Sequence, residues 1–261
     1  MTIDVHAYLG AWAFRHLPAV EPAAFVRRLE RAGIDRAFVS ATEAILYKDP
    51  QEANRLLASR VRGYEDHLLP VATLNPRLSG WERDWAWCLG TLAPVGLRLH
   101  PNYHGYPLAG AEAGALIDAA VRAVLTIFVV NRIEDERVHH PLARVAPLPV
   151  EDMAAALRAA PRGHFVLCGL RLAEVKALAE HAPDVTHYAV EISHLQHPLD
   201  ALEGLRAVLP AERILLGSGA PLLMPEPAVY KVLKARLPEE EKHAILEGNA
   251  ARLVRQGGAG A

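Results

Sequence analysis

The first residues of the chain, Thr2-Ile3-Asp4-Val5-His6-Ala7-Tyr8, have the pattern of a β-strand, because apolar and polar side chains alternate along them. Seven more short runs rich in β-branched and apolar residues follow, with starts about 20 to 40 residues apart. That spacing leaves room for one helix after each strand. The predicted strands are Thr2–Tyr8, Arg36–Ala41, Leu68–Leu74, Gly96–His100, Val124–Asn131, His164–Cys168, Thr186–Ser193 and Arg213–Ser218.

Segments with apolar residues three or four apart, the period of an amphipathic helix, fill the gaps between these strands. The predicted helices are Pro22–Arg31, Asp49–Tyr64, Ala111–Arg122, Val150–Ala160, Ala173–Ala182, Pro198–Val208, Pro227–Arg236 and Glu239–Val254. Alternating strands and helices predict an α/β fold, a (β/α)8 TIM barrel, although an open doubly wound sheet fits the same pattern. We expect one barrel domain over residues 1–256 and a flexible tail over 257–261, with the long connection Arg132–Pro149 at the ligand face.

The composition restricts the classes of partner. The 261 residues are 51% hydrophobic, and 28 Lys and Arg against 30 Asp and Glu give a net charge of −2. A chain this close to neutrality is not expected to capture nucleic acid or an anionic membrane by charge. Two cysteines, Cys88 and Cys168, are too few for a disulfide framework or a four-cysteine zinc site. The sequence shows no signal peptide or membrane-spanning stretch, so we expect a cytoplasmic protein.

Polar side chains gather at the predicted strand ends, where a barrel of this kind forms its ligand site. In the first strand, the two-residue period places Asp4, His6 and Tyr8 on one face, which we expect to line the lumen. The fourth strand repeats this pattern with Arg98 and His100. Together with the ends of the other strands, the candidate site residues are His6, Tyr8, Arg98, His100, Asn102, His104, Arg132, Glu191, His194 and Ser218.

The chemistry of these side chains suggests two groups. Imidazole and phenol groups can assist proton transfer near neutral pH, so the predicted catalytic residues are His6, Tyr8, His100 and His104. Guanidinium groups match carboxylate and phosphate, which predicts a small anionic substrate. The predicted substrate-binding residues are Arg98, Asn102, Arg132, Glu191, His194 and Ser218. As structural alternatives, His6 and His104 can be ordinary hydrogen-bonded histidines, and Arg98 can form a buried ion pair with Asp4 or Glu191.

Four stretches resemble motifs of the amidohydrolase-related (amidohydrolase 2) family of metal-dependent hydrolases. Ile3–Gly10 is similar to its opening Asp-x-His-x-His strand, and Gly96–Pro101 to its fourth-strand motif. Leu215–Pro221 is similar to its Gly-Ser-Asp-x-Pro motif, and Gly248–Leu253 to its closing Gly-Asn-Ala-x-Arg-Leu helix. The resemblance covers nearly the whole chain. It implies a (β/α)8 barrel, a divalent metal that is commonly zinc, and hydrolysis or decarboxylation of small molecules, often carboxylates and lactones.

The chain departs from the family pattern at the positions that the resemblance assigns to metal ligands. Tyr8 replaces the second histidine of the first strand, and the fifth strand ends in Asn131-Arg132 where the family has a histidine. The sixth strand, where a histidine is also expected, reads Phe165-Val166-Leu167-Cys168-Gly169. Gly219 replaces the aspartate that is both ligand and general base in the family, and only His6 remains. Zinc needs three or four N, O or S ligands. We therefore interpret the chain as a divergent family member with a degenerate metal site, and Cys168 as a core residue.

Three functional hypotheses remain at this stage. In the first, the chain is a hydrolase or decarboxylase with a rebuilt site, either without a metal or with one bound by His6, His100, His104 and Glu191. In the second, the barrel has lost catalysis and binds a small anion or a partner protein. In the third, an ordinary family activity is retained through ligands that the sequence does not identify. We expect no cofactor, with zinc as the alternative that the resemblance implies, and we allow for a homodimer.

Overall fold

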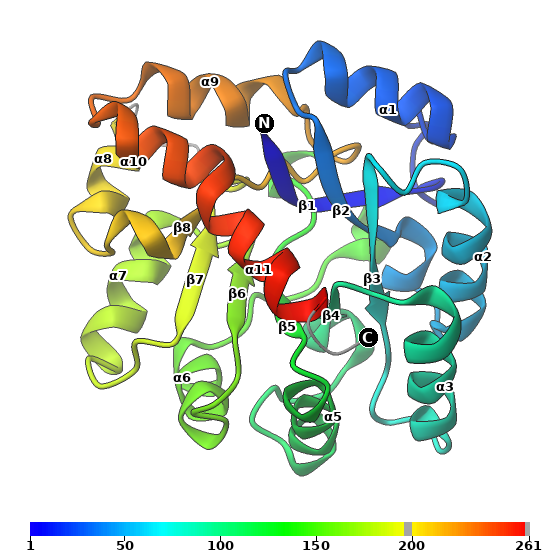
Figure 1. Cartoon of the computed structure of the whole chain (residues 1–261). Helices are drawn as coiled ribbons and strands as arrows, with labels where there is room; N and C mark the ends of the chain where they lie inside the picture. The colour runs from blue at the N-terminus through cyan, green and yellow to red at the C-terminus, as the bar shows by residue number, and fades with distance from the viewer. Residues whose placement is uncertain (196–199, 259–261) are drawn as a thin grey trace.

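The computed structural model of the chain describes residues 1–195 and 200–258. It contains eight parallel strands in the order β1 to β8, with helices around the outside (Figure 1). Every predicted strand is present. The strands are β1 (Ile3–Leu9), β2 (Arg36–Ala41), β3 (Leu68–Thr73), β4 (Gly96–Leu99), β5 (Thr126–Val130), β6 (Phe165–Cys168), β7 (Tyr188–Glu191) and β8 (Ile214–Leu215).

Backbone hydrogen bonds join the first strand to the segment that follows the last one. The N–H of Val5 donates to the carbonyl of Leu216 (2.9 Å), and the N–H of Tyr8 donates to the carbonyl of Ala220 (2.7 Å). The N–H of Gly219 donates in return to the carbonyl of His6 (2.7 Å). These bonds bring the two edges of the sheet together, so the predicted barrel is confirmed and the open sheet is excluded.

The helices are α1 (Pro22–Arg31), α2 (Gln51–Val61), α3 (Trp81–Trp87), α4 (Pro101–His104), α5 (Ala111–Arg122), α6 (Val150–Ala159), α7 (Leu172–His181), α8 (Ala201–Arg206), α9 (Glu226–Lys234), α10 (Glu239–His243) and α11 (Asn249–Gly258). Each predicted helix has a counterpart after its strand, α3 and α4 are additional, and the predicted helix Glu239–Val254 is divided into two. A π-helical turn, η6 (Ala244–Gly248), joins the last two. The start of the predicted helix Pro198–Val208 lies outside the described residues. Of the expected tail 257–261, the first two residues belong to α11 and the other three lie outside the described residues.

Two apolar clusters form the core. One lies between the strands and the outer helices, and the other fills the barrel lumen with side chains such as Phe38, Val71 and Phe128. Trp12 and Ile133, from the loops that follow β1 and β5, also belong to the lumen cluster, as does Ala250 of α11. The lumen is therefore a packed core that loops cover at one end and the last helix covers at the other, as is usual for this architecture.

The first strand differs from its predicted alternation. Between the pairs Asp4–Ala37 and Ala7–Val39, β1 contains one residue more than β2, which is a β-bulge. Ile3, Val5 and Tyr8 consequently belong to the lumen cluster, whereas Ala7 packs toward the helices. Asp4 does not share a face with His6 and Tyr8. The bulge changes which residues face inward partway along the strand, and this places His6 and Tyr8 together inside the barrel.

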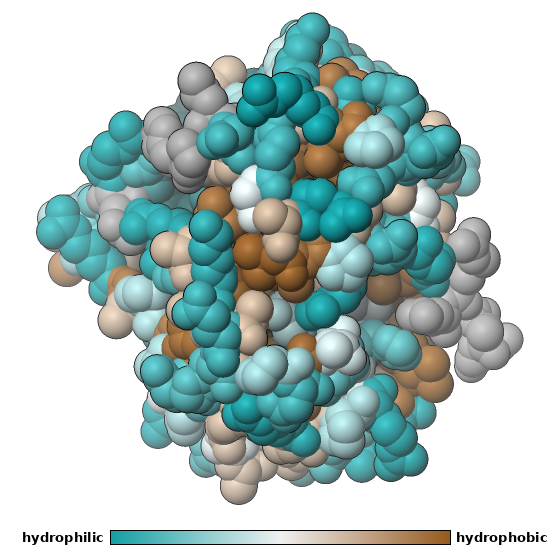
Figure 2. All heavy atoms as spheres, turned by 90° about the vertical axis from the view of Figure 1, so that its left-hand side faces the viewer, coloured by the Kyte–Doolittle hydropathy of each residue, from teal (hydrophilic) through white to brown (hydrophobic). Residues whose placement is uncertain are grey.

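The surface gives no sign of a membrane-spanning segment: none of the described helices is long and apolar enough to cross a bilayer. Figure 2 shows one side of the molecule, on which hydrophilic residues surround separate hydrophobic patches. A homodimer stays a prediction.

Candidate functional site

Four buried side chains form a continuous hydrogen-bonded chain across the lumen, which we call the buried relay (Glu191, His6, Tyr8 and His100). His6 Nδ1 lies 3.2 Å from Glu191 Oε1, and His6 Nε2 lies 3.1 Å from Tyr8 Oη. Tyr8 Oη lies 3.1 Å from His100 Nε2. All four side chains are inaccessible to solvent. The members come from β1, the end of β4 and the end of β7, so the barrel brings together residues that are distant in the sequence.

Glu191 is the anionic end of the relay. Its carboxylate accepts hydrogen bonds from the N–H of Gly169 (2.6 Å), the N–H of Ser193 (2.6 Å) and the hydroxyl of Ser193 (2.8 Å). Burial alone would raise the pKa of Glu191, but His6 and these donors together hold it at about 2. A side chain at Gly217 would overlap the Glu191 carboxylate, so glycine at this position leaves the space that the carboxylate occupies.

The ionised carboxylate sets the direction of every bond in the relay. Because Glu191 can only accept, His6 Nδ1 donates to it. Burial lowers the pKa of His6, so the ring is neutral and Nε2 accepts from the Tyr8 hydroxyl, whose own pKa burial raises. His100 Nε2 then donates to Tyr8 Oη, and burial together with His104 and Arg98 holds the pKa of His100 well below its usual value.

His100 Nδ1 is the open end of the relay. In the part of the chain that the structure describes, this buried nitrogen has no hydrogen-bond partner. His104 lies beside it, with the two ring centroids 5.7 Å apart. His104 Nε2 donates to the carbonyl of Ala44 (3.0 Å), and its buried Nδ1 is likewise without a partner among the described residues. Two neutral imidazoles therefore present free acceptor nitrogens at the end of β4.

Arg98 supports the relay from within the lumen. Its guanidinium donates to the carbonyls of Ala7 (2.7 Å) and Val5 (3.0 Å), which flank the bulge, and it lies 4.9 Å from the centre of the Tyr8 ring. The side chain is inaccessible to solvent. Its contacts are with backbone carbonyls rather than with Asp4 or Glu191, so the structure places Arg98 as a support for β1 and Tyr8.

Arg132, predicted to bind substrate, forms a bidentate ion pair with Glu174. Its two terminal nitrogens each lie 2.6 Å from a Glu174 oxygen, and Nη1 also lies 3.3 Å from the carbonyl of Gly169. Glu174 accepts in addition from the N–H of Arg171 at the start of α7. The structure therefore joins Arg132 to α7 and does not bring it into the buried relay.

Replacing Arg132 with alanine is expected to lower the free energy of unfolding by about 1 to 3 kcal/mol, because a largely buried ion pair loses one partner. Urea unfolding of the parent and the variant measures this change. If instead the stability is unchanged and substrate affinity falls, Arg132 acts at the ligand site after all.

Asn102 and His194 occupy different parts of the mouth. Asn102 Nδ2 donates to the carbonyls of Asn131 (2.9 Å) and Ala146 (3.1 Å), which fastens the long loop after β5. His194 Nδ1 lies 3.0 Å from the Ser193 hydroxyl, which in turn donates to the relay carboxylate. Burial lowers the pKa of His194 to about 4. His194 is therefore connected to the buried relay, whereas Asn102 is not.

Ser218 and Asp4 close the seam between β1 and β8. The Asp4 carboxylate accepts from the N–H of Ser218 (3.0 Å), the hydroxyl of Ser218 and the N–H of His6 (2.9 Å). Burial raises the pKa of Asp4 to about 7, against the opposing effect of these hydrogen bonds. Both side chains are buried, so Ser218 acts in the seam, next to the relay, and its hydroxyl is already engaged.

Replacing Asp4 with asparagine tests this shifted pKa. Because the folded state holds the proton of Asp4 more tightly than the unfolded state, protonation of Asp4 contributes to the free energy of unfolding. This contribution is complete below the unfolded-state pKa, near 4, and declines as pH rises toward the folded-state pKa of about 7. Asparagine has no such loss. We expect the free energy of unfolding of Asp4→Asn, relative to the parent, to increase between pH 5 and pH 7 by up to about 1.4 kcal/mol per pH unit. A difference that does not change with pH would contradict the assignment.

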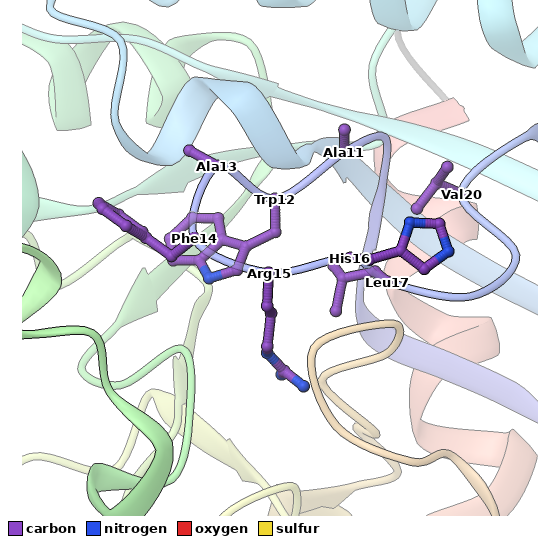
Figure 3. A pocket seen from close by; sticks show the side chains of 8 residues that line it. All are labelled: Ala11, Trp12, Ala13, Phe14, Arg15, His16, Leu17 and Val20. Carbon is purple, nitrogen blue, oxygen red and sulfur yellow. The ribbon is translucent and has the colours of Figure 1, made fainter.

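Loops from β1 and β5 cover the mouth above the relay. Trp12 Nε1 and Arg15 Nε donate to the two oxygens of Glu134 (3.1 and 2.9 Å), a carboxylate that is only 2% exposed. Phe14 stacks on His140, with ring centroids 4.6 Å apart. The β1 loop itself lines an open pocket of about 370 Å³, with the Trp12 and Phe14 rings on one side and His16 on the other (Figure 3). These contacts fasten the two loops together and exclude solvent from the relay.

A second cavity, of about 390 Å³, opens beside the ends of β7 and β8. Ser193 and Ser218 line it together with Arg137 and Lys231, and the remaining lining is mainly apolar. Lys231 Nζ donates to the carbonyl of Ile192 (2.8 Å), and burial lowers the pKa of this lysine to about 8. Arg137 is held by a bidentate ion pair with Asp135 (2.9 and 2.6 Å), so the positive charge of Lys231 in an otherwise apolar hollow is the feature that suits a small anion with a hydrophobic body.

A family model described as amidohydrolase matches residues 3–256 of the sequence. The chain belongs to this amidohydrolase family. A search of curated protein sequences returned no match. Among solved structures, 5-carboxyvanillate decarboxylase from Sphingomonas paucimobilis is similar, with a TM-score of 0.71, 16% identity, and coverage of 97% of this chain and 98% of that one.

Two further solved amidohydrolase-fold enzymes show the same architecture. A 2,6-dihydroxybenzoate decarboxylase in complex with 2,6-dihydroxybenzoate has a TM-score of 0.74 at 14% identity, over 97% of this chain and 99% of that one. A dihydroxybenzoic acid decarboxylase from Polaromonas sp. JS666, with bound manganese and the inhibitor 2-nitroresorcinol, has a TM-score of 0.70 at 14% identity, over 97% and 96%. At these identities the likeness establishes the fold.

The amidohydrolase family implies a metal, so we compared the side chains present with that requirement. Three side chains could hold a metal ion together: a ring nitrogen of His6, the sulfur of Cys168 and a carboxylate oxygen of Glu191 lie within 4.8 Å of one another. Among the described residues, this is the group of potential ligands that the structure forms. The set that includes His100 and His104 is not brought together. From the sequence, Cys168 is interpreted as a core residue. Its place on the sixth strand, where the family has a histidine, is the signal that could have identified it as a candidate ligand.

Proposed function

We propose that this amidohydrolase-family chain is an enzyme that hydrolyses or decarboxylates a small anionic molecule at the mouth of the barrel. The observation that carries the proposal is the buried relay, in which an ionised carboxylate, a neutral imidazole, a phenol and a second imidazole are hydrogen bonded in sequence. Burying four titratable side chains is costly, and the hydrogen bonds between them offset that cost at every relay atom except His100 Nδ1, which has no partner among the described residues. Such an arrangement is typical of a catalytic site.

The relay can move a proton across the lumen. A proton accepted at His100 Nδ1 displaces the Nε2 proton toward Tyr8, the Tyr8 proton toward His6 Nε2, and the His6 Nδ1 proton toward Glu191. Because the pKa of His100 lies well below its usual value and that of Glu191 is about 2, neither end of the relay keeps an added proton at rest, so the transfer is transient and reverses within the reaction. Hydrolysis needs a group that removes a proton from water and returns it to the leaving group, and decarboxylation needs one that protonates the carbon that loses CO2.

The cavity beside β7 and β8 supports the choice of an anionic substrate. Lys231 supplies positive charge there, whereas Arg137 is paired with Asp135, and Ser193 links the cavity to the Glu191 end of the relay. Similar decarboxylases act on aromatic carboxylates according to their names, which agrees with an anion carried on an apolar body. We also propose that the family's metal-ligand pattern is degenerate here, because Tyr8 and Gly219 supply neither the imidazole nor the carboxylate of that pattern. When bound, a divalent metal would polarise a substrate oxygen or activate water.

Turnover of a compound panel tests the proposed function. The panel contains aromatic and aliphatic carboxylic acids, assayed for CO2 release, and lactones and amides, assayed for acid release. We expect the full-length protein, purified without chelators, to turn over at least one class. Absence of turnover across the panel by folded protein would contradict the proposal.

The alternative, a catalytically inactive barrel that binds a small anion, has one observation in its favour. The loops fastened through Glu134 leave the relay inaccessible to solvent. If panel members bind with ordinary affinity but none is converted, this alternative is the better account.

A further inference from the structure

Three ligand-type atoms of different chemistry converge at the Glu191 end of the relay. They are a ring nitrogen of His6 on β1, the thiol of Cys168 at the end of β6, and a carboxylate oxygen of Glu191 at the end of β7. All lie within 4.8 Å of one another, and none of the three side chains is accessible to solvent. Nitrogen, sulfur and oxygen donors in one group are the ligands that zinc and similar transition metals take.

The spacing of these atoms is close to that of a coordination shell. Bonds of about 2.0 to 2.3 Å to a tetrahedral zinc ion place ligand atoms about 3.3 to 3.8 Å apart. His6 Nδ1 and Glu191 Oε1, at 3.2 Å, already lie near that spacing. The Cys168 thiol, packed in the lumen cluster, forms a long contact with the carbonyl of Val166 (3.7 Å), and a movement of about 1 Å toward the other two would bring its sulfur to coordination spacing.

The surroundings of the group resemble the outer shell of a metal site. The N–H groups of Gly169 and Ser193 and the Ser193 hydroxyl fix the orientation of the Glu191 carboxylate. On the far side of the imidazole, Tyr8 is bonded to His6 Nε2. Outer-shell hydrogen bonds of this kind orient ligating histidines and carboxylates and are needed for affinity.

We propose that His6, Cys168 and Glu191 form a binding site for a divalent transition-metal ion such as zinc, with Cys168 bound as the thiolate. Binding forms a metal–sulfur bond and releases the thiol proton to solvent, without oxidation or reduction. His6 binds through Nδ1 and its ring proton is then on Nε2, which donates to Tyr8; the Tyr8 hydroxyl donates in turn to His100 Nε2, and the proton of His100 moves to its Nδ1. Three protein ligands leave one tetrahedral position open for water or substrate, as in catalytic zinc sites.

This inference rests on the proposed function only in placing the chemistry in the same barrel, and a bound metal would replace the His6–Glu191 hydrogen bond, so that Tyr8, His100 and the ring of His6 remain as the proton path. It names a cofactor and a ligand set. This set differs from the family pattern because the Cys168 thiolate and the Glu191 carboxylate on β7 take the place of histidines that the family has. Metal binding is measured without a substrate. Turnover by a protein that binds no metal would leave the proposed function standing and remove this inference, and metal binding without turnover would do the reverse.

Cys88 provides the matched control. It is the second cysteine of the chain, is equally buried, and lies beside Gln51 Oε1 (3.7 Å) outside the barrel lumen. It is not part of the group of ligand atoms found among the described residues. Replacing Cys88 with serine leaves Cys168 as the sole thiol.

The experiment loads metal-depleted full-length protein with Co²⁺, which reports thiolate ligation through a near-ultraviolet charge-transfer band. We expect the parent and Cys88→Ser to bind one equivalent with this band, and Cys168→Ser to lose the band and bind at least tenfold more weakly. Circular dichroism checks that each variant is folded. Co²⁺ that does not bind to the folded parent, or binds equally to Cys168→Ser with an unchanged spectrum, would overturn the proposal.

Zinc-edge X-ray absorption on Cys88→Ser keeps the test decisive even if Cys168→Ser does not fold. We expect one sulfur neighbour at about 2.3 Å from zinc. A shell of nitrogen and oxygen alone would show that Cys168 is not a ligand.

Discussion

Replacing Arg98 with methionine is expected to lower the free energy of unfolding by about 3 to 5 kcal/mol. Arg98 is the largest fully buried side chain of the described residues, and its guanidinium donates to the carbonyls of Ala7, Val5 and Phe38. Methionine fills much of the volume but leaves these carbonyls without their charged donor. Because the carbonyls belong to β1 and β2, the loss falls on the strand that contains the bulge.

Chemical denaturation measures the effect, and Arg98→Lys is the control. Lysine keeps the charge but not the planar fork, so it cannot reach all three carbonyls, and we expect an intermediate loss. A methionine variant as stable as the parent would mean that the guanidinium is held for ligand binding rather than for the architecture of β1.

Replacing Tyr8 with phenylalanine is expected to lower kcat about 10²- to 10⁴-fold on a panel compound that the parent converts. The phenol hydroxyl is the link between His6 and His100, 3.1 Å from each ring nitrogen, and phenylalanine removes only that oxygen. The ring and its packing against Arg98 remain, so we expect the free energy of unfolding to change far less than the turnover.

Tyr106→Phe is the matched control for Tyr8→Phe. Tyr106 is also buried, but its hydroxyl has no hydrogen-bond partner among the described residues, and it lies outside the relay. We expect its turnover to match that of the parent. Equal activity of Tyr8→Phe and the parent would show that the relay is a structural network.

The architecture follows from the sequence because its causes are local. Strands such as Arg36–Ala41 are short, mainly apolar runs, and helices such as Pro22–Arg31 carry an apolar face at a helical period. Both elements form with the predicted bounds. Alternation of the two types then leaves few topologies, of which the barrel is one.

The side-chain pairings of the site depend on contacts that no local pattern specifies. Period two predicts one face for Asp4, His6 and Tyr8, but the bulge in β1 places Asp4 in the seam with Ser218. Arg132 meets a carboxylate 42 residues away on α7 instead of a ligand. A bulge and an ion pair of this kind arise only when strands and helices pack. The sequence therefore predicts which residues lie near the site, but not which contacts each of them makes.

Cys168 illustrates a different limit. From its sequence context, Cys168 cannot be told apart from a core residue, because it is a small thiol in the apolar, buried strand Phe165–Cys168. Its proximity to His6 and Glu191 follows from the closed barrel, which sets the end of β6 beside the end of β7 and across from β1. These three side chains become neighbours only in the folded barrel.

The most direct test of the central claim, that the buried relay works as one unit in catalysis, is the turnover of a double variant. Tyr8→Phe and His100→Ala are made singly and together, and kcat is measured on the same panel compound. Members of one relay lose their function together, so we expect the double variant to be within a few-fold of the slower single variant. Single effects that multiply in the double variant would contradict the account.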